Sequence, residues 1–297
     1  MANTEFNVIR YLRTLQDRER YRQAEQYMRI LREGTYYGKQ NSEVSFNGIL
    51  LSQYNYTVEK TAWHYHENPY FMFVLGGNMM DCNTKVKTLC PSGSIMFNNW
   101  QEAHYGSKHS EKANGFHLEF QQDWFENNRI HMNLLEGSQL IENPKMHFLF
   151  AKLYHEFLLS DDYSELSVEL LLLQICETLG EIKENDSKNI PDWIIRLREL
   201  LHYDTSDLSL QYLSEQLDVH PVHISRAAPK YLSASLGEYI RQHKIKKAIP
   251  LILDSSNSLT EIAYQTGFSD QSHFNRVFKS YFDMNPSLYR KNLHKNL

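Results

Sequence analysis

Two stretches near the carboxyl end of the chain repeat the same pattern of residues. "SLQYLSEQLDVHPVHISR" at 209–226 is echoed by "SLTEIAYQTGFSDQSHFNR" at 258–276, with an offset of 49 residues at the start (209 to 258) and 50 at the end (226 to 276). Internal similarity at a fixed spacing is typical of a duplicated structural unit. This part of the chain is therefore expected to build one small unit twice.

The second copy carries the signals of two short helices joined by a tight turn. Ser258 and Glu261 have the spacing of a capping box, which predicts the start of a helix. Gly267 fits the positive φ needed where the chain leaves that helix, and Ser269 is expected to cap the next one. Short helix, glycine turn, short helix is helix-turn-helix geometry.

Aromatic residues after the turn indicate which face of the second helix is buried. Phe274, Val277 and Phe278 repeat at helical spacing and predict an inward face. The opposite face then presents, near its amino-terminal half, Gln271, Ser272, Asn275 and Arg276. Amides suit adenine edges and Arg suits guanine, while the flanking His273 and Lys279 suit phosphates. A merely solvated polar face is the alternative, and the duplication favours base reading.

The segment between the two copies predicts a connecting helix from about 236 to 253. At 1.5 Å per residue such a helix is roughly 27 Å long, and successive major grooves lie roughly 34 Å apart, a difference that DNA bending would close. Its inward residues are expected to be Tyr239, Ile240, Ile245, Ala248, Ile249 and Ile252. Its outward residues are expected to be Arg241, Lys244, Lys246 and Lys247.

Positive charge is concentrated in the same region. The net charge of the whole chain is −5, which argues against a general polyanion binder. From residue 226 to the end, however, Lys and Arg number 11 against 5 Asp and Glu, as expected for a surface that meets nucleic acid.

Residues 191–292 resemble the DNA-binding domain of AraC/XylS-family transcriptional regulators, which predicts such a domain at 191–297. The stretch "LTEIAYQTGFSDQSHFNRVFKSYFDMNPSLYR" follows the family signature in order, including the closing Pro286 and Tyr289. The resemblance implies that bases are read by Val222, Ser225 and Arg226 in the first unit and by Gln271, Ser272, Asn275 and Arg276 in the second. It also implies promoter DNA and possible RNA polymerase as partners, and favours activation over repression.

The first unit departs from the family pattern at four positions. Asp218 replaces the turn glycine, His220 replaces the capping serine and Ala228 replaces a core phenylalanine. Pro229 lies inside or at the end of the recognition helix, where it removes a backbone donor and costs about 3 kcal/mol relative to alanine. The first unit is expected to read DNA more loosely, and Pro250 raises a similar question about the connecting helix.

The sequence pattern of residues 44–121 predicts a mostly antiparallel β domain. Runs such as "YFMFVL" and "SIMF" are separated by turn signals at 76–78 and 91–93. "AWHYHENPYFMFVLGGN" and "CPSGSIMFNNWQEAH" resemble the two motifs of cupin barrels, which AraC-type regulators use as sensor domains. The resemblance aligns His64, His66 and His104 with metal-binding histidines, while Tyr70 stands in place of the usual glutamate.

Three interpretations of this β domain remain open from the sequence. The first is a metal-free pocket for a small organic effector, lined by Trp63, His64, His66, Tyr70, Trp100 and His104. The second is a residual metal site at the three histidines, since a His-x-His pair on a strand places both rings on one face. The third is that these histidines are structural remnants. No cofactor is predicted.

The remaining segments complete a predicted α+β organisation. Residues 1–40 form an amino-terminal arm with an exposed amphipathic helix at 10–33, followed by a cupin-like effector-sensing and dimerisation domain at 41–182 and a polar linker at 183–190. The expected fold is a cupin-like β-barrel with two appended helices, then an all-α domain with two helix-turn-helix motifs joined by a linking helix. The helices at 144–160 and 163–182 are expected either to pair two copies of the chain or to cover the barrel.

Other classes of protein are less well supported. A metal-dependent cupin enzyme fused to a DNA-binding module would use the three histidines, but no acid/base carboxylate is recognisable nearby. An architectural DNA-binding protein would need more positive charge. No apolar run reaches the roughly 18 residues of a membrane span, and the amino terminus lacks an apolar signal core. Cys82, Cys90 and Cys176 are expected to be buried free thiols. Together these features predict a cytoplasmic protein.

Overall fold

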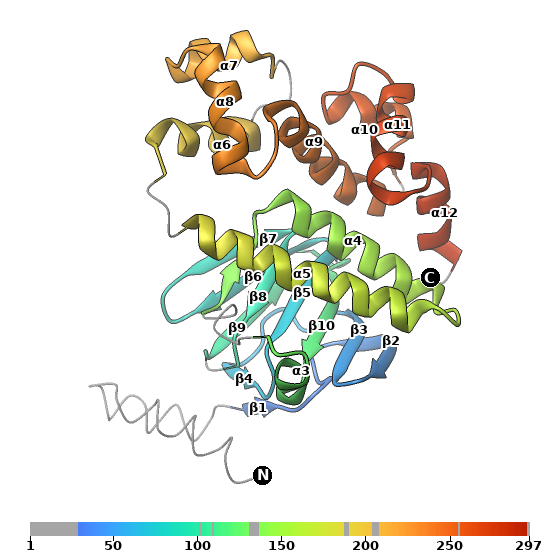
Figure 1. Cartoon of the computed structure of the whole chain (residues 1–297). Helices are drawn as coiled ribbons and strands as arrows, with labels where there is room; N and C mark the ends of the chain where they lie inside the picture. The colour runs from blue at the N-terminus through green and yellow to red at the C-terminus, as the bar shows by residue number, and fades with distance from the viewer. Residues whose placement is uncertain are drawn as a thin grey trace, which may run out of the picture. The chain divides into compact units, whose positions relative to one another are not determined.

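A computed structural model describes residues 29–100, 102–108, 110–130, 137–186, 190–203, 208–254 and 256–295 (Figure 1). The chain divides into two compact units, Met1–Ile141 and Glu142–Leu297. The described part of the first unit is mainly β and that of the second is α-helical, so the chain has the mixed α+β class expected from its sequence.

The first unit contains two sheets. The five-stranded sheet has the order β1(Arg29–Leu31), β4(His64–His66), β9(His104–Lys108), β6(Asn78–Asn83) and β7(Lys87–Pro91). The six-stranded sheet has the order β11(Gln139–Leu140), β8(Ile95–Asn98), β5(Tyr70–Gly76), β10(Asn114–Phe120), β3(Ile49–Asn55) and β2(Lys39–Phe46). A short helix, α3(Gln122–Asn127), follows β10. All strand pairs are antiparallel except β1 with β4, which confirms the mostly antiparallel β domain.

The predicted amino-terminal helix is wrong for its last residues. Residues 29–31 form β1, which pairs with β4 from Arg29↔His64 to Leu31↔His66. A distant strand edge supplies these hydrogen bonds, so local helical periodicity could not reveal the pairing. The rest of that prediction, residues 10–28, lies outside the described residues.

Helices make up the second unit. They are α4(Pro144–Leu159), α5(Ser164–Asp186), α6(Asp192–Tyr203), α7(Leu210–Leu217), α8(Pro221–Leu232), α9(Leu236–Leu253), α10(Leu259–Gln265), α11(Gln271–Phe282) and α12(Pro286–Lys295). Thus α5 continues four residues into the segment expected to be a linker, and residues 187–189 are not described. None of the described helices is both long and apolar enough to cross a membrane.

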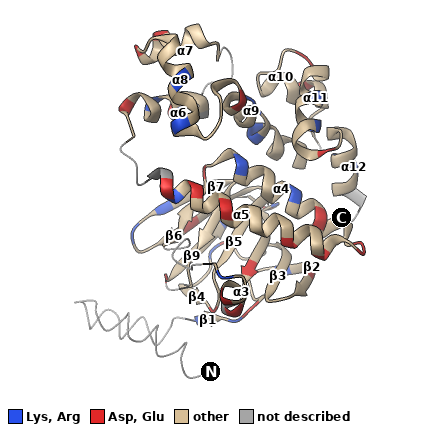
Figure 2. Ribbon diagram, in the orientation of Figure 1, with Lys and Arg blue, Asp and Glu red and all other residues tan. Residues whose placement is uncertain are grey.

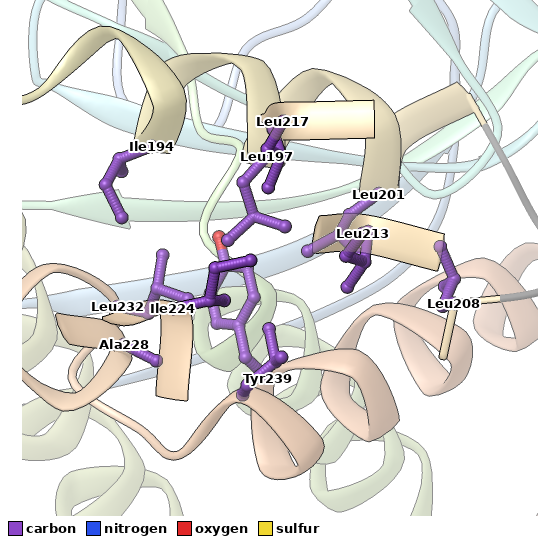
Figure 3. Packing of buried hydrophobic residues seen from close by; sticks show 11 residues of the cluster. Ile194, Leu197, Leu201, Leu208, Leu213, Leu217, Ile224, Ala228, Leu232 and Tyr239 are labelled. Atoms are coloured by element: carbon purple, nitrogen blue, oxygen red, sulfur yellow. The ribbon is translucent and has the colours of Figure 1, made fainter. Parts of the chain in front are cut away.

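The first repeat unit has its own apolar core. Figure 3 shows side chains from α6, α7, α8 and α9 converging, among them Leu197, Leu213, Ile224 and Tyr239. Ala228, at the position expected for a phenylalanine, is also fully buried in this cluster. Several side chains on one face of α8 are therefore buried in this core, and the opposite face of the helix is exposed to solvent.

The second repeat unit is held by stacked aromatic rings. Phe274, Phe278 and Phe282 of α11 are buried, and the Phe278 and Phe282 rings stack with centroids 4.3 Å apart. Tyr289 of α12 lies 5.5 Å from the Phe278 ring and 5.1 Å from the Phe282 ring. The predicted inward face of this helix is confirmed.

Helix α4 packs within the second unit against α9, α11 and α12. The Tyr289 hydroxyl donates to the Ala151 carbonyl at 2.8 Å, and Lys246 forms an ion pair of 2.6 Å with Glu142. The Phe148 ring lies 4.7 Å from that of Tyr281. These contacts place α4 and α5 in one compact unit with the carboxyl-terminal helices, whereas the sequence had suggested a division at 183–190.

Candidate functional site

The turn of the second repeat unit is fixed by its caps. Both hydrogen bonds of the Ser258–Glu261 capping box are present, and Gly267 has φ +80°, as predicted. The predicted cap at Ser269 is wrong, because the carboxylate of Asp270 accepts from the His273 backbone at 2.7 Å. A carboxylate is favoured there by the helix dipole, and this contact lowers the pKa of Asp270.

Side chains of α11 differ in how freely they face solvent. Ser272, Arg276 and Lys279 are exposed, and Gln271 and His273 are partly buried. Asn275 is also partly buried, and its side-chain oxygen is enclosed without a hydrogen-bond partner among the described residues. In the amino-terminal half of α11, the Arg276 side chain is therefore accessible to a ligand, whereas the Asn275 side chain is only partly accessible.

Gln271 is held by the preceding helix. The Thr260 hydroxyl on α10 donates to the Gln271 side-chain oxygen at 2.6 Å. The amide nitrogen of Gln271 keeps both its hydrogens for another partner, which suits the acceptor atoms of a base edge.

The connecting helix supports the same turn. α9 matches the predicted span, and Figure 2 shows Lys and Arg on it as well as on α8 and α11. Two of its lysines do not simply face outward as predicted. Lys244 donates to the Gly267 carbonyl at 2.5 Å, and Lys246 is only 14% exposed in its ion pair with Glu142. Carbonyl and carboxylate partners within the unit compete successfully with water for these ammonium groups.

The first repeat unit presents a different surface. Val222 is 48% exposed, and Ser225 and Arg226 are exposed beside it on α8. The His220 side chain caps the helix by accepting from the Val222 backbone at 3.3 Å. Pro229 lies inside α8 without ending it, and Pro250 likewise lies inside α9.

Asp218 takes the turn position of the first unit in the left-handed conformation, with φ 53°. Aspartate tolerates that conformation better than most residues other than glycine, although less well than glycine itself. The departure from glycine thus preserves the turn.

A cavity of about 50 Å³ lies in the first unit. Its lining comes from both sheets, from the segment before β2 and from the segment between β3 and β4. It comprises Tyr36, Tyr37, Tyr56, Val58, Thr61, His64, His66, Tyr70, Met72, Met79, Met80, Asp81, His104, Gly106 and His117. Four of the residues predicted to line an effector pocket are among them, but the Trp63 and Trp100 side chains are not. Trp63 is 39% exposed and packs on Tyr105.

The histidines at 64, 66, 104 and 117, here called the pocket histidines, are buried and uncharged at neutral pH. Desolvation lowers the pKa of His64 and of His117 to about 3 and that of His104 to about 4, and it lowers the pKa of His66 well below the ordinary value. No Lys or Arg is among the lining residues. The cavity therefore offers an anion no positive charge.

One potential ligand nitrogen of each of His64, His66 and His104 lies within 4.8 Å of the other two. Beside them, burial raises the pKa of Asp81 to about 7, and its carboxylate lies 4.0 Å from Nε2 of His104. The Tyr70 hydroxyl contacts the same Nε2 at 3.2 Å and accepts from the Asn98 amide at 3.0 Å. Five potential metal-binding or proton-exchanging groups thus share one end of the cavity.

Tyr36 and His117 are among the cavity residues that sequence reasoning missed. Tyr36 stacks on His117 with centroids 3.8 Å apart, and its hydroxyl donates to Glu119 at 2.9 Å. His117 and Glu119 alternate with Phe116 and Leu118 along β10, so the period of two could have indicated a polar inward face. Nothing near Tyr36 in the sequence shows that its loop reaches this strand.

Comparisons with known proteins address the helical unit. A family described as "Helix-turn-helix domain" matches residues 213–292. The multiple antibiotic resistance protein MarA of Salmonella typhimurium is 35% identical over 107 residues, which are 36% of this chain and 80% of MarA. The Msm operon regulatory protein of Streptococcus mutans is 27% identical over 119 residues, covering 40% of this chain and 42% of that protein.

Among solved structures, wild-type ToxT of Vibrio cholerae aligns with 86% of this chain and 98% of its own, at 16% identity and a TM-score of 0.36. The sequence matches define the class of protein to which the repeated helical unit belongs. The chain is a member of the AraC family of helix-turn-helix, DNA-binding transcriptional regulators.

Proposed function

We propose that this protein recognises specific promoter sequences chiefly through α11. The observation that carries the proposal is the exposed Arg276 on a helix whose opposite face is locked by buried aromatic rings. A rigid helix holds Arg276 where it can donate two hydrogen bonds to a guanine edge, with Ser272 and the restrained Gln271 beside it and Asn275 contributing in part. His273 and Lys279 then contact phosphates.

The first unit acts as the looser reader. On α8, Arg226 and Ser225 offer hydrogen bonds, and the exposed Val222 suits a thymine methyl group. Pro229 weakens this helix because it leaves a backbone carbonyl without its usual partner. The 18-residue α9, about 27 Å long, joins the two readers, and this length suits contacts about one helical turn of DNA apart.

The first unit is proposed to be a cupin-like sensor whose cavity binds a small organic effector. Aromatic walls, neutral histidines and the absence of Lys and Arg from the lining favour an uncharged ligand over a carboxylate or phosphate. In this scheme residues 41–182 sense the effector and pair the copies, and residues 191–297 bind DNA. An effector can change transcription only by favouring one arrangement of the protein over another, and activation in the cytoplasm is the expected outcome.

Pairing of two copies is proposed to use α5. Tyr163, Leu166, Leu170 and Leu173 are 75%, 60%, 52% and 49% exposed and follow the 3-4-3 spacing of a helix-pairing seam. The apolar side chains of α4, the other helix expected to pair, are mostly buried within the chain. The seam formed by Tyr163, just before α5, and the three leucines of α5 is thus the surface available to a second copy.

A metal-dependent cupin enzyme remains a second candidate for the first unit, because of the three clustered histidines. Metal analysis of the purified protein separates this candidate from the effector sensor.

The proposal for DNA is tested by selecting bound duplexes from a random library at physiological salt. A regulator of this kind should enrich one site with two unequal half-sites about one helical turn apart. Enrichment without any base preference would contradict it. Mapping bound sites in the cell would then indicate the regulated genes.

A further inference from the structure

One of the three clustered histidines, His64, is held as a metal-binding histidine usually is. His64 turns Nδ1 toward the Ala62 carbonyl at 2.8 Å, which leaves Nε2 with its lone pair for the cavity. A backbone carbonyl that holds the outer nitrogen of an imidazole is the usual support of a metal-bound histidine. Nδ1 of His104, in contrast, is enclosed without a hydrogen-bond partner among the described residues.

Tyr70 hydrogen-bonds with Nε2 of His104, the nitrogen that a metal in the cavity would need as a ligand. Its hydroxyl lies 3.2 Å from Nε2 of His104 and accepts a hydrogen bond from Asn98. The Asn98 amide nitrogen faces Tyr70 as a donor, and Asn98 also acts to lower the pKa of the neighbouring Asp81 carboxyl against the effect of burial. Because Tyr70 accepts from Asn98, its own hydrogen is free to be donated to His104.

The result is a donor set that does not fit a divalent ion. Metal binding requires a free lone pair on each imidazole, and the lone pair of His104 Nε2 accepts the Tyr70 hydrogen. The Tyr70 ring is buried, and its centroid lies 4.4 Å from that of His66, so the phenol stands within the cluster. Neutral phenol also supplies no negative charge, unlike the glutamate that the cupin resemblance leads one to expect at this position.

We propose that Tyr70 excludes divalent metals from the three-histidine cluster and so reserves the cavity for an organic ligand. Asn98 sets the direction of the Tyr70 hydroxyl, and Tyr70 satisfies His104 in the place of an ion. The proposal concerns the cavity alone and does not depend on which helix reads DNA.

Direct metal titration of the full-length protein tests the proposal. Zn²⁺ binding is measured by calorimetry, and Co²⁺ binding by visible absorption, for the wild type, Tyr70→Phe and Tyr70→Glu. Tyr70→Phe removes one hydrogen bond from His104 and should tighten Zn²⁺ binding at the cluster about tenfold. Tyr70→Glu adds a carboxylate ligand and should tighten it further, with a Co²⁺ spectrum of a defined site.

Tyr56→Phe is the matched control. It removes another buried phenol of the cavity, which contacts Nε2 of His117 at 2.9 Å and lies outside the three-histidine cluster. Its metal affinity should equal that of the wild type. Adding His64→Ala to Tyr70→Phe should abolish the gained site, which separates it from surface histidines.

Three results would overturn the proposal. One is a wild type that itself binds one equivalent of Zn²⁺ with submicromolar affinity and loses this binding on His64→Ala. Another is a Tyr70→Phe protein with native near-ultraviolet circular dichroism and no gain in affinity. The third is an equal gain in Tyr56→Phe. The first needs neither Tyr70 variant to fold, and none affects the selection of DNA sites.

Discussion

Replacing Leu170 by aspartate should separate two paired copies. Fully burying a leucine contributes about 1.5–3 kcal/mol, and Leu170 is 52% exposed in the single chain, so pairing can gain only about 1 kcal/mol from it. A carboxylate forced into an apolar seam costs at least about 1 kcal/mol more. Each change occurs twice in a symmetric pair, so pairing should lose about 4 kcal/mol of free energy. This loss raises the dissociation constant of the pair roughly a thousandfold.

Sedimentation-velocity ultracentrifugation over a range of concentrations measures this change. Leu89→Asp is the matched control, since Leu89 is 53% exposed on β7 and lies outside the α5 seam. The control should keep the wild-type distribution of species while Leu170→Asp becomes monomeric. If Leu170→Asp sedimented as the wild type does, the seam on α5 would not be the pairing surface.

Three further predictions concern the DNA reader and the cavity. Thr260→Val removes the donor that restrains Gln271 and should reduce discrimination between bases at one operator position about fivefold, as measured by competition binding. Ser280→Ala loses a hydroxyl that bonds to its own helix and should leave this discrimination unchanged. Lys279→Ala should weaken all sequences alike and lower the salt slope by about one; a selective loss would contradict its phosphate role. Because the folded pKa values of the pocket histidines lie below the unfolded value of about 6.5, their stabilisation is present above that pH and is lost as pH falls toward 4. Asp81, whose pKa is raised in the folded protein, offsets one of the protons that the histidines take up on unfolding. The midpoint of thermal unfolding, followed by circular dichroism, should therefore shift to lower temperature between pH 6.5 and pH 5. A constant midpoint would show that these histidines are not held neutral.

The sequence predicted best the features that depend on neighbouring residues. The capping box at Ser258, the positive φ of Gly267 and the inward Phe274 and Phe278 all follow from local spacing, and all are confirmed. The three cysteines are also buried and free as expected. Such features need only the backbone geometry of one helix and one turn.

Features set by distant contacts could not be predicted in this way. The strand at 29–31 depends on pairing with residues 64–66, and the stacking of Tyr36 on His117 joins segments 81 residues apart in the chain (36 to 117). Asp270 displaced Ser269 as the cap because either side chain could accept the same hydrogen bond, and a carboxylate accepts it more strongly. Spacing alone does not decide between two adjacent acceptors.

A base-by-base affinity profile of the selected operator, measured for the wild type and for Arg276→Ala, tests the central assignment most directly. We predict that the variant loses roughly 1–3 kcal/mol at one base pair, where the wild type requires guanine, and keeps its preferences elsewhere. A profile that fell uniformly at every position, or did not change, would mean that α11 does not read the bases.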